Sequence, residues 1–452
     1  MSNLSIPTTP TGDYYQQRND RQPSFNNDLF TQLLRPENLQ QAWRQVKANK
    51  GAAGIDGMTI DAFPLWLQQG GWQQCKSQLE HGEYSPSAVR RVEIDKSDGG
   101  KRKLGIPTVI DRVIQQAIAQ ILTPLFDPFF STNSFGFRPN RNAKQAVLQV
   151  QDIIKQKRIF AVDVDLSKFF DRVNHDFLMT QLRKKVQDKG LLALIGKYLR
   201  AGVMVNDQFE ASSEGVPQGG PLSPLLSNIM LDSLDKELEN RGHQFVRYAD
   251  DFIILVRSQR AGVRVLNSVT HYLATKLKLV VNERKSQVVK VSQSQFLGFT
   301  FTRGQIQWHA KTVRIFKQKV KRLTNRNWGV SMGYQLFKLR QYLQGWINYF
   351  GIANAYQACV ELDQWIRRRV RMCYWRQWRK PRTKVQNLLK RGVKVQTAVY
   401  CGITSKGPWR SSKTAGIQQA LSNEYLKKAG LYSLRDGSQF IIPTRKLARR
   451  SK

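Results

Sequence analysis

The sequence predicts an α+β fold, in which helices back an antiparallel sheet, followed by a helical and strongly basic second part. Three observations carry this prediction. From about Leu29 to residue 300, short apolar segments alternate with amphipathic ones. Two of the apolar segments are separated by only three residues, as in a hairpin. After residue 305 the alternation gives way to long basic segments rich in Trp.

Three amphipathic segments predict helices that would back the sheet. Asp111 is placed to cap the first, in which apolar residues recur every three or four positions as far as Leu122. The same spacing recurs over residues 143–154 and 226–238. Pro224 is expected in the first turn of the last helix, because proline is tolerated there.

Four short segments rich in β-branched and aromatic residues predict the strands of the sheet. They are residues 159–164, 245–248, 252–256 and 296–301. Only Ala249, Asp250 and Asp251 separate the second segment from the third. Such a short connection predicts a tight β-hairpin.

Length and composition limit the classes of protein. A chain of 452 residues is long enough for two or three domains, and 41% hydrophobic residues can bury a core. No apolar run is long enough to cross a membrane and no signal pattern opens the chain, so we expect a cytoplasmic protein. The cysteines are not paired at two-residue spacing, which suits a reducing compartment and argues against structural zinc; they are Cys75, Cys359, Cys373 and Cys401.

The charge of the chain indicates a polyanionic partner. The sequence holds 72 Lys and Arg against 33 Asp and Glu, a net charge of +39. Residues 301–452 contain 33 of these cations and only four acids, so this stretch carries +29 of the total. Cations that neutralise phosphates release condensed counterions, so this excess is typical of nucleic-acid-binding proteins. The alternative interpretation is a basic surface that only aids solubility.

The predicted hairpin places acidic side chains at one end of the sheet. Asp250 and Asp251 lie in its turn, and Asp165 follows the strand over residues 159–164. If these strands are neighbours, the three carboxylates meet. Clustered carboxylates repel one another unless cations lie among them, and their oxygen atoms suit a pair of Mg²⁺ ions that catalyse phosphoryl transfer. Taken alone, an Asp-Asp pair in a turn is more often merely solvated.

Three further segments accompany the carboxylates, and each also has a purely structural interpretation. The adjacent Phe169 and Phe170 are most simply core residues. The glycines of residues 215–224 permit close backbone approach, and the helix that follows can direct its amide end at a phosphate, but the segment can also be a plain loop. Lys96 and the glycine turn of residues 99–107 can cover a triphosphate or form only an exposed basic hairpin.

The order of these motifs resembles one family closely, the reverse transcriptases and maturases encoded by bacterial group II introns. The resemblance covers about residues 30–450. It is carried by Asn49 to Gly57, Gly105-Ile106-Pro107, Ser134 to Pro139, Asp165 with Phe169-Phe170-Asp171, Pro217-Gln218-Gly219, Tyr248-Ala249-Asp250-Asp251, Lys285-Ser286, Phe296 to Phe299 and Leu343 to Phe350. It implies a right-hand polymerase with fingers, a palm and a helical thumb.

The resemblance also implies roles for single residues. Asp165, Asp250 and Asp251 would bind two Mg²⁺ ions and catalyse the addition of dNTP substrates to a primer. The residues implied to bind the incoming nucleotide are Lys96 and Arg102 at the triphosphate, Phe170 against the sugar, Gln218 in its loop, and Lys285 behind the palm. The implied partners are the intron RNA, an RNA template with a DNA primer, and target DNA.

The basic second part interleaves cations with aromatic residues, which suits contacts with phosphates and bases. The aromatic side chains are expected mostly in the core and the arginines mostly on RNA. The expected nucleic-acid contacts are Arg138, Arg367, Arg368, Arg371, Arg376, Arg379 and Lys380. Many relatives end in a zinc-containing nuclease domain, whose paired Cys and His are not found here, so second-strand cleavage is not expected.

These observations predict the organisation and function of the chain. The expected parts are a flexible leader (1–25), fingers and palm (26–305), a thumb or maturase domain (306–380) and a basic DNA-binding segment (381–452). The expected function is RNA-directed DNA synthesis in an intron ribonucleoprotein, with support of splicing and retrohoming. Two alternatives stay open: a splicing factor with an inactive polymerase, and a free-standing or defence-associated reverse transcriptase.

Overall fold

The computed structural model describes residues 28–95, 100–206 and 208–440, and these form two compact units. Of the described residues, those within 28–94, 102–129 and 170–230 form the first unit, and those within 95–101, 130–169 and 231–440 form the second. The predicted leader over residues 1–25 lies outside the described residues. In the described part of the chain, no helix is long and apolar enough to span a membrane.

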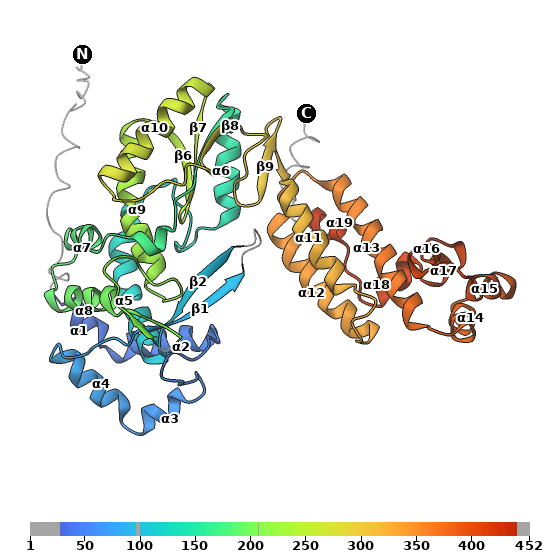
Figure 1. Ribbon diagram of the computed structural model, residues 1–452, viewed down its shortest axis with the longest axis horizontal. Coiled ribbons are helices and arrows are strands. Elements are labelled where there is room, and N and C mark those ends of the chain that lie inside the picture. Colours follow the sequence, from blue (N-terminus) through green and yellow to red (C-terminus); the bar gives the residue numbers. More distant parts are fainter. Residues whose placement is uncertain (1–27, 96–99, 207, 441–452) are drawn as a thin grey trace, which may run out of the picture. The chain divides into compact units, whose positions relative to one another are not determined.

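The first unit contains a four-stranded sheet of order β2-β1-β4-β5 (Figure 1). Strand β1 pairs with β4 in parallel, and β4 pairs with β5 in antiparallel orientation. The strands are β1 (Val89–Asp95), β2 (Lys101–Ile106), β4 (Val203–Val205) and β5 (Gln208–Glu210). The helices of this unit are α1 (Leu29–Leu33), α2 (Pro36–Ala48), α3 (Phe63–Gln68), α4 (Gly71–Glu80), α5 (Val109–Phe126), η2 (Asp127–Phe129), η3 (Phe169–Arg172), α7 (His175–Arg183) and α8 (Lys189–Arg200).

Helix α5 supplies much of the core of this unit, as its apolar spacing predicts, but it is not capped as expected. The Thr108 hydroxyl accepts the backbone N–H of Asp111 and is the N-cap. Asp111 instead lies within the first turn, where its buried carboxylate accepts the hydroxyls of Thr108, Tyr84 and Tyr198. Burial raises the pKa of Asp111, and these hydrogen bonds oppose that shift.

The second unit is built on a four-stranded antiparallel sheet of order β6-β7-β3-β8, with helix α6 on one face and α10 on the other (Figure 1). Its strands are β3 (Phe160–Val164), β6 (Gln244–Tyr248), β7 (Asp251–Val256) and β8 (Gln287–Lys290). The helices are α6 (Ala143–Lys155), α9 (Ser223–Asn240), which continues from the first unit, and α10 (Gln259–Thr275). Three of the four predicted strands and both of the later predicted helices are therefore confirmed.

The fourth predicted strand begins later than expected. Phe296 exchanges two backbone hydrogen bonds with Phe299, so residues 296–298 form a turn. Strand β9 (Phe299–Thr302) then pairs with β10 (Gln305–Trp308) as a separate hairpin.

Three long helices follow the β9–β10 hairpin and share one core with it. Trp346 lies at the centre of this core, with its ring 4.7 Å from that of Trp308 and 4.4 Å from that of Phe316. Trp375 and Trp378 are buried, as predicted for the aromatic residues of the basic part. The helices are α11 (Ala310–Leu323), α12 (Met332–Phe350) and α13 (Tyr356–Gln377).

Six short helices complete the described chain; the last of them packs on α12 and α13, and several of the others pack on one another. The Asp363 carboxylate on α13 accepts the backbone N–H groups of Leu434 and Arg435, so it caps the last helix. These helices are α14 (Pro381–Leu389), α15 (Val395–Gly402), α16 (Pro408–Ser411), α17 (Ala415–Ala420), α18 (Asn423–Lys428) and α19 (Leu434–Phe440). All four cysteines are buried and free.

Candidate active site

Strand pairing in the second unit brings the predicted carboxylates to one end of the sheet. Strands β3 and β7 are neighbours, and their register ends with Val164 opposite Phe252. The next two residues to face each other beyond this pair are therefore Asp165 and Asp251, which lie at the same end of the sheet. Opposite residues of an antiparallel pair lie on one face, and so do residues two positions apart on one strand. Asp163 consequently shares this face with Asp165 and Asp251.

The carboxylates are close enough to change one another's protonation. Burial, followed by the charges of Asp163, Asp250 and Asp165, raises the pKa of Asp251 to about 7. Burial and Asp165 raise the pKa of Asp163 to about 6. A Leu297 backbone hydrogen bond opposes the shift of Asp251. Asp163 was not among the predicted residues, although its two-residue spacing from Asp165 was a signal for it.

The chemistry of this cluster fits a divalent cation. Carboxylate oxygens are the ligands that Mg²⁺ takes from proteins, and a cation would relieve the repulsion that raises the pKa of Asp251. Among the residues that the structure describes, however, no three His, Cys, Asp or Glu side chains converge closely enough to hold a metal ion. The donor atoms are suitable, but the carboxylates have to converge further to share an ion.

The hairpin between β6 and β7 has a strained turn. Tyr248 pairs with Asp251, so Ala249 and Asp250 form a two-residue loop. Ala249 has φ of +60°, which short hairpin turns require but which costs a residue with a side chain about 1–2 kcal/mol. The Arg247 guanidinium stabilises the turn by donating from Nη1 to the Ala249 carbonyl, 2.9 Å away.

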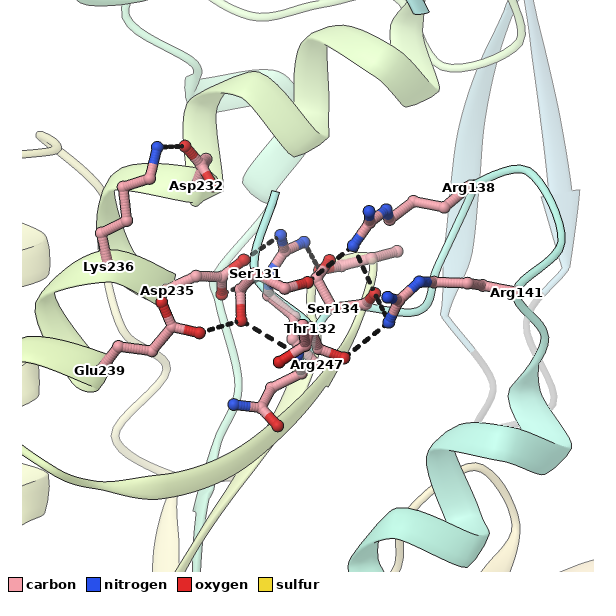
Figure 2. Close-up of polar contacts among 12 residues, drawn as sticks. Ser131, Thr132, Ser134, Arg138, Arg141, Asp232, Asp235, Lys236, Glu239 and Arg247 are labelled. Atoms are coloured by element: carbon pink, nitrogen blue, oxygen red, sulfur yellow. Dashed lines mark hydrogen bonds and ion pairs between the residues drawn. The ribbon is translucent and has the colours of Figure 1, made fainter. Parts of the chain in front are cut away.

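Arg247 is itself fixed by a buried ion pair with helix α9. Its Nε and Nη2 donate to the two carboxylate oxygens of Asp235 at 2.7 and 2.5 Å, and both side chains are 0% exposed (Figure 2). Planar, two-point contacts of this kind fix orientation as well as distance. The pair therefore joins α9 to the turn that carries Asp250 and Asp251. Neither partner was predicted.

The segment that precedes α6 pairs with β6 and presses against the same turn. Arg247 donates its backbone N–H to Asn133 and accepts that of Phe135, both at 2.9 Å. A side chain at Gly136 would place its Cβ 2.2 Å from the backbone nitrogen of Ala249, closer than atoms can approach. Only glycine fits this contact, because no flexible atom is there to give way.

Replacing Gly136 by Ala is expected to push the hairpin turn out of place. We expect the DNA synthesis that the sequence predicts to fall by about 100-fold, since misplacement of reacting groups by about 1 Å has that effect. Primer extension measures this loss. Gly57→Ala is the matched control, because a Cβ at Gly57 meets nothing within 4 Å, although its positive φ adds backbone strain. Equal losses in the two variants would mean that the turn contact is unimportant.

Arg138, which is predicted to contact nucleic acid, has several partners within this segment. It is 8% exposed, and its Nη1 donates to the carbonyls of Ser131 and Ser134 at 2.6 and 3.0 Å (Figure 2). Its guanidinium also lies 5.4 Å from the centre of the Phe130 ring. These contacts hold the loop that carries Gly136.

The backbone of Asp165 is fixed by the loop before β8. Its carbonyl accepts the N–H of Asn282 at 2.8 Å, and its own N–H donates to the Ser286 hydroxyl at 3.0 Å. The predicted Lys285 is exposed in this loop. The structure therefore places Lys285 beside the backbone of Asp165, within the second unit.

The other predicted nucleotide-binding residues lie in the first unit. The Phe170 carbonyl accepts the N–H of Val216 at 2.7 Å, which joins it to the glycine-rich loop. The Gln218 carbonyl in that loop accepts the N–H of Gly105 on β2 at 2.7 Å, and Arg102 is exposed on the same strand. Lys96 lies outside the described residues. The predicted site residues thus form two groups, one in each unit.

The predicted arginines of α13 differ in what they contact. Arg368 lies 3.6 Å from the centre of the Trp409 ring, and its Nη2 donates to the Trp409 carbonyl at 3.1 Å. Arg371 donates to the Leu421 carbonyl at 2.9 Å. Both therefore attach the following short helices to α13. Arg367 is partly buried, whereas Arg376, Arg379 and Lys380 are exposed.

Known proteins resemble this chain over most of its length. Residues 94–301 match the family "Reverse transcriptase (RNA-dependent DNA polymerase)", and residues 313–392 match "Group II intron, maturase-specific domain". Protein YkfC of Escherichia coli is 32% identical over 354 residues, which cover 69% of this chain and 92% of YkfC. The group II intron-encoded protein LtrA of Lactococcus lactis is 30% identical over 339 residues, 60% of this chain and 56% of LtrA.

Proposed function

Because the chain belongs to the family of reverse transcriptases with a maturase domain that group II introns encode, we propose that it copies RNA into DNA and promotes splicing of its intron. The reaction adds deoxynucleotides to a primer 3′-hydroxyl. Its setting is a bacterial intron ribonucleoprotein, which uses the reaction for retrohoming into target DNA. Fingers and palm take residues 26–305, the thumb 306–380 and a DNA-binding segment 381–452.

The carboxylate cluster at the end of β3 and β7 carries this proposal. Three acidic side chains share one face and end of the sheet inside the region that matches reverse transcriptases, and the pKa of Asp251 is raised to about 7. Binding of RNA alone does not require carboxylates that repel one another. Perturbed carboxylates of this kind are typical of catalytic sites.

We assign two Mg²⁺ ions to Asp165, Asp250 and Asp251. When bound, such ions activate the attacking hydroxyl and stabilise the leaving pyrophosphate. The chain's own residues supply position: Arg247 and Gly136 hold the turn with Asp250 and Asp251. The nucleotide is assigned to Lys96 and Arg102 at its triphosphate, Phe170 at its sugar, Gln218 in the loop and Lys285 near the pyrophosphate.

Primer extension tests the proposal directly. With poly(rA) as template, oligo(dT) as primer and dTTP, wild-type protein is expected to make product in Mg²⁺ and none in EDTA. Asp250→Ala is expected to make none in either, while it binds RNA like the wild type. A wild-type protein that binds RNA but never extends the primer would favour the inactive splicing factor instead.

Replacing Phe170 by Val is expected to relax selection against ribonucleotides. A ring at the position of the ribose 2′-hydroxyl excludes it sterically, and removing the ring frees that space. Discrimination in kcat/KM between dTTP and UTP should fall about 10- to 200-fold, the range that pocket size alone achieves. Phe170→Tyr keeps the bulk and is the control. Unchanged discrimination in the Val variant would remove Phe170 from the nucleotide site.

A further inference from the structure

A hollow of about 560 Å³ lies between the loop that joins α11 to α12 and the end of α13. It belongs to the second unit and contains none of the proposed catalytic residues. Its volume lies in the range of pockets that bind small molecules. It is lined by Asn325, Arg326, Asn327, Trp328, Gly329, Val330, Ser331, Gln335, Cys373, Arg376, Gln377 and Arg379.

The lining of this hollow is cationic and contains no acidic residue. Arg326 comes from the loop, Arg376 comes from the last turn of α13, and Arg379 follows the end of that helix. All three side chains are exposed, and none forms a hydrogen bond or an ion pair with another residue that the structure describes. On the same helix, Arg368 and Arg371 donate to backbone carbonyls. The hollow is therefore lined by arginines whose side chains do not stabilise the fold through hydrogen bonds or ion pairs with described residues.

An exposed aromatic ring stands beside these cations. Trp328 is 36% exposed and Tyr334 is 46% exposed, although both are large apolar side chains that folding usually buries. Their ring centres are 6.0 Å apart and tilted by 59°, so the two rings are not stacked face to face. Trp328 keeps part of its surface exposed beside the arginines, and aromatic rings hold bases by stacking in single-stranded nucleic-acid sites.

The loop that carries Trp328 is fixed by side chains of the two helices below it. Gln377 on α13 donates its Nε2 to the Val330 carbonyl at 2.9 Å. Buried Gln335 on α12 donates its Nε2 to the Leu323 carbonyl at 3.0 Å, where the loop begins. The hollow is therefore formed before any ligand binds, which reduces the entropy lost on binding.

We propose that this pocket binds one unpaired nucleotide of an RNA strand, with the base stacked on Trp328 and the flanking phosphates paired with Arg326, Arg376 and Arg379. The choice of RNA rests on the proposed function of the chain. A duplex does not fit this chemistry, because its bases are stacked inside the helix and present no face to an indole. The pocket is therefore expected to bind unpaired RNA in preference to duplex RNA.

Binding of two labelled RNAs to the full-length protein tests the pocket. The probes are a ten-nucleotide oligo(rA) and a blunt ten-base-pair RNA duplex made of two strands. Trp328→Ala is expected to weaken binding of oligo(rA) by about tenfold or more, the loss typical of one stacked base, and to change binding of the duplex by less than twofold. Trp328→Phe keeps a ring and is expected to restore most of the affinity.

A charge-matched control separates the pocket from general basicity. Arg376→Gln and Arg382→Gln remove one exposed cation each, but Arg382 does not line the hollow. Arg376→Gln should weaken oligo(rA) binding more than Arg382→Gln does. The proposal is overturned if these two variants weaken binding equally. It is also overturned if Trp328→Ala weakens binding of both RNAs equally. The proposed polymerase activity has a separate test, and it is contradicted if the wild-type protein does not extend a primer.

Discussion

Replacing Asp251 by Asn is expected to abolish DNA synthesis and at the same time to stabilise the metal-free protein. Loss of a ligand that holds catalytic ions removes several kcal/mol of transition-state stabilisation, which corresponds to a rate loss of about 1,000-fold or more. The same substitution removes a charge that burial and three neighbouring carboxylates disfavour. Opposite effects on activity and stability are typical of residues kept for function.

The stabilisation depends on pH in a direction that the pKa shift fixes. The pKa of Asp251 is raised from 3.8 to about 7, so metal-free protein loses stability as pH rises between these values and Asp251 ionises. The Asn variant does not undergo this loss. Because Asp251 keeps some solvent contact, we expect the variant to gain on the order of 1–3 kcal/mol at pH 8.

Thermal unfolding in EDTA at pH 5 and pH 8 measures this gain, and primer extension in Mg²⁺ measures the lost activity. The difference in melting temperature between variant and wild type should be larger at pH 8. Ser258→Ala, which removes the cap of helix α10 beyond the other end of strand β7, should lower stability at both pH values instead. If the Asp251→Asn protein were less stable than the wild type, this would contradict the inference that burial and the neighbouring carboxylates disfavour the charge of Asp251.

Replacing Arg247 by Met is expected to destabilise the second unit. It is also expected to reduce DNA synthesis by more than the fraction of unfolded protein accounts for. The substitution leaves the buried Asp235 carboxylate without its partner, which typically costs about 3–5 kcal/mol. It also removes the donor to the Ala249 carbonyl. The strained turn then loses the contact that fixes it, and primer extension is expected to fall by about tenfold or more even where the protein remains folded.

Two further variants separate these effects. Arg241→Met breaks a pair with Glu237 on the same helix α9, but that pair is about 30% exposed, so it should cost less than about 1 kcal/mol. The double variant Arg247→Met with Asp235→Leu removes both buried charges, so stability should recover while synthesis stays low. Recovery of synthesis in the double variant would show that Arg247 acts only through stability.

Local patterns in the sequence were sufficient to predict the hairpin and most helices. Apolar strands on both sides of residues 249–251 leave the chain no alternative to a tight turn, and the helical period of residues 226–238 is carried by neighbouring residues alone. The cap of α5 was predicted wrongly because Thr108 and Asp111 are both good capping residues, and only geometry decides between them.

Features that depend on how separate elements pack could not be predicted in this way. Arg247 on β6 and Asp235 on α9 are only 12 residues apart, but neither residue by itself reveals that their side chains meet. Arg138 was named from the Ser134–Pro139 segment that carries the family resemblance, and that segment alone does not show that its guanidinium donates to the carbonyls of Ser131 and Ser134. Spacing alone places Asp163 on the same face as Asp165, but the presence of Asp251 on that face depends on pairing between strands far apart in sequence.

Crystals of the protein with a primer–template and Mn²⁺ in place of Mg²⁺ test the central claim most directly. The anomalous signal of manganese locates the ions without reference to activity. The account predicts peaks within coordinating distance, about 2.2 Å, of carboxylate oxygens from Asp165, Asp250 and Asp251. Peaks bound elsewhere in crystals that still extend the primer, with these three carboxylates left apart, would contradict it.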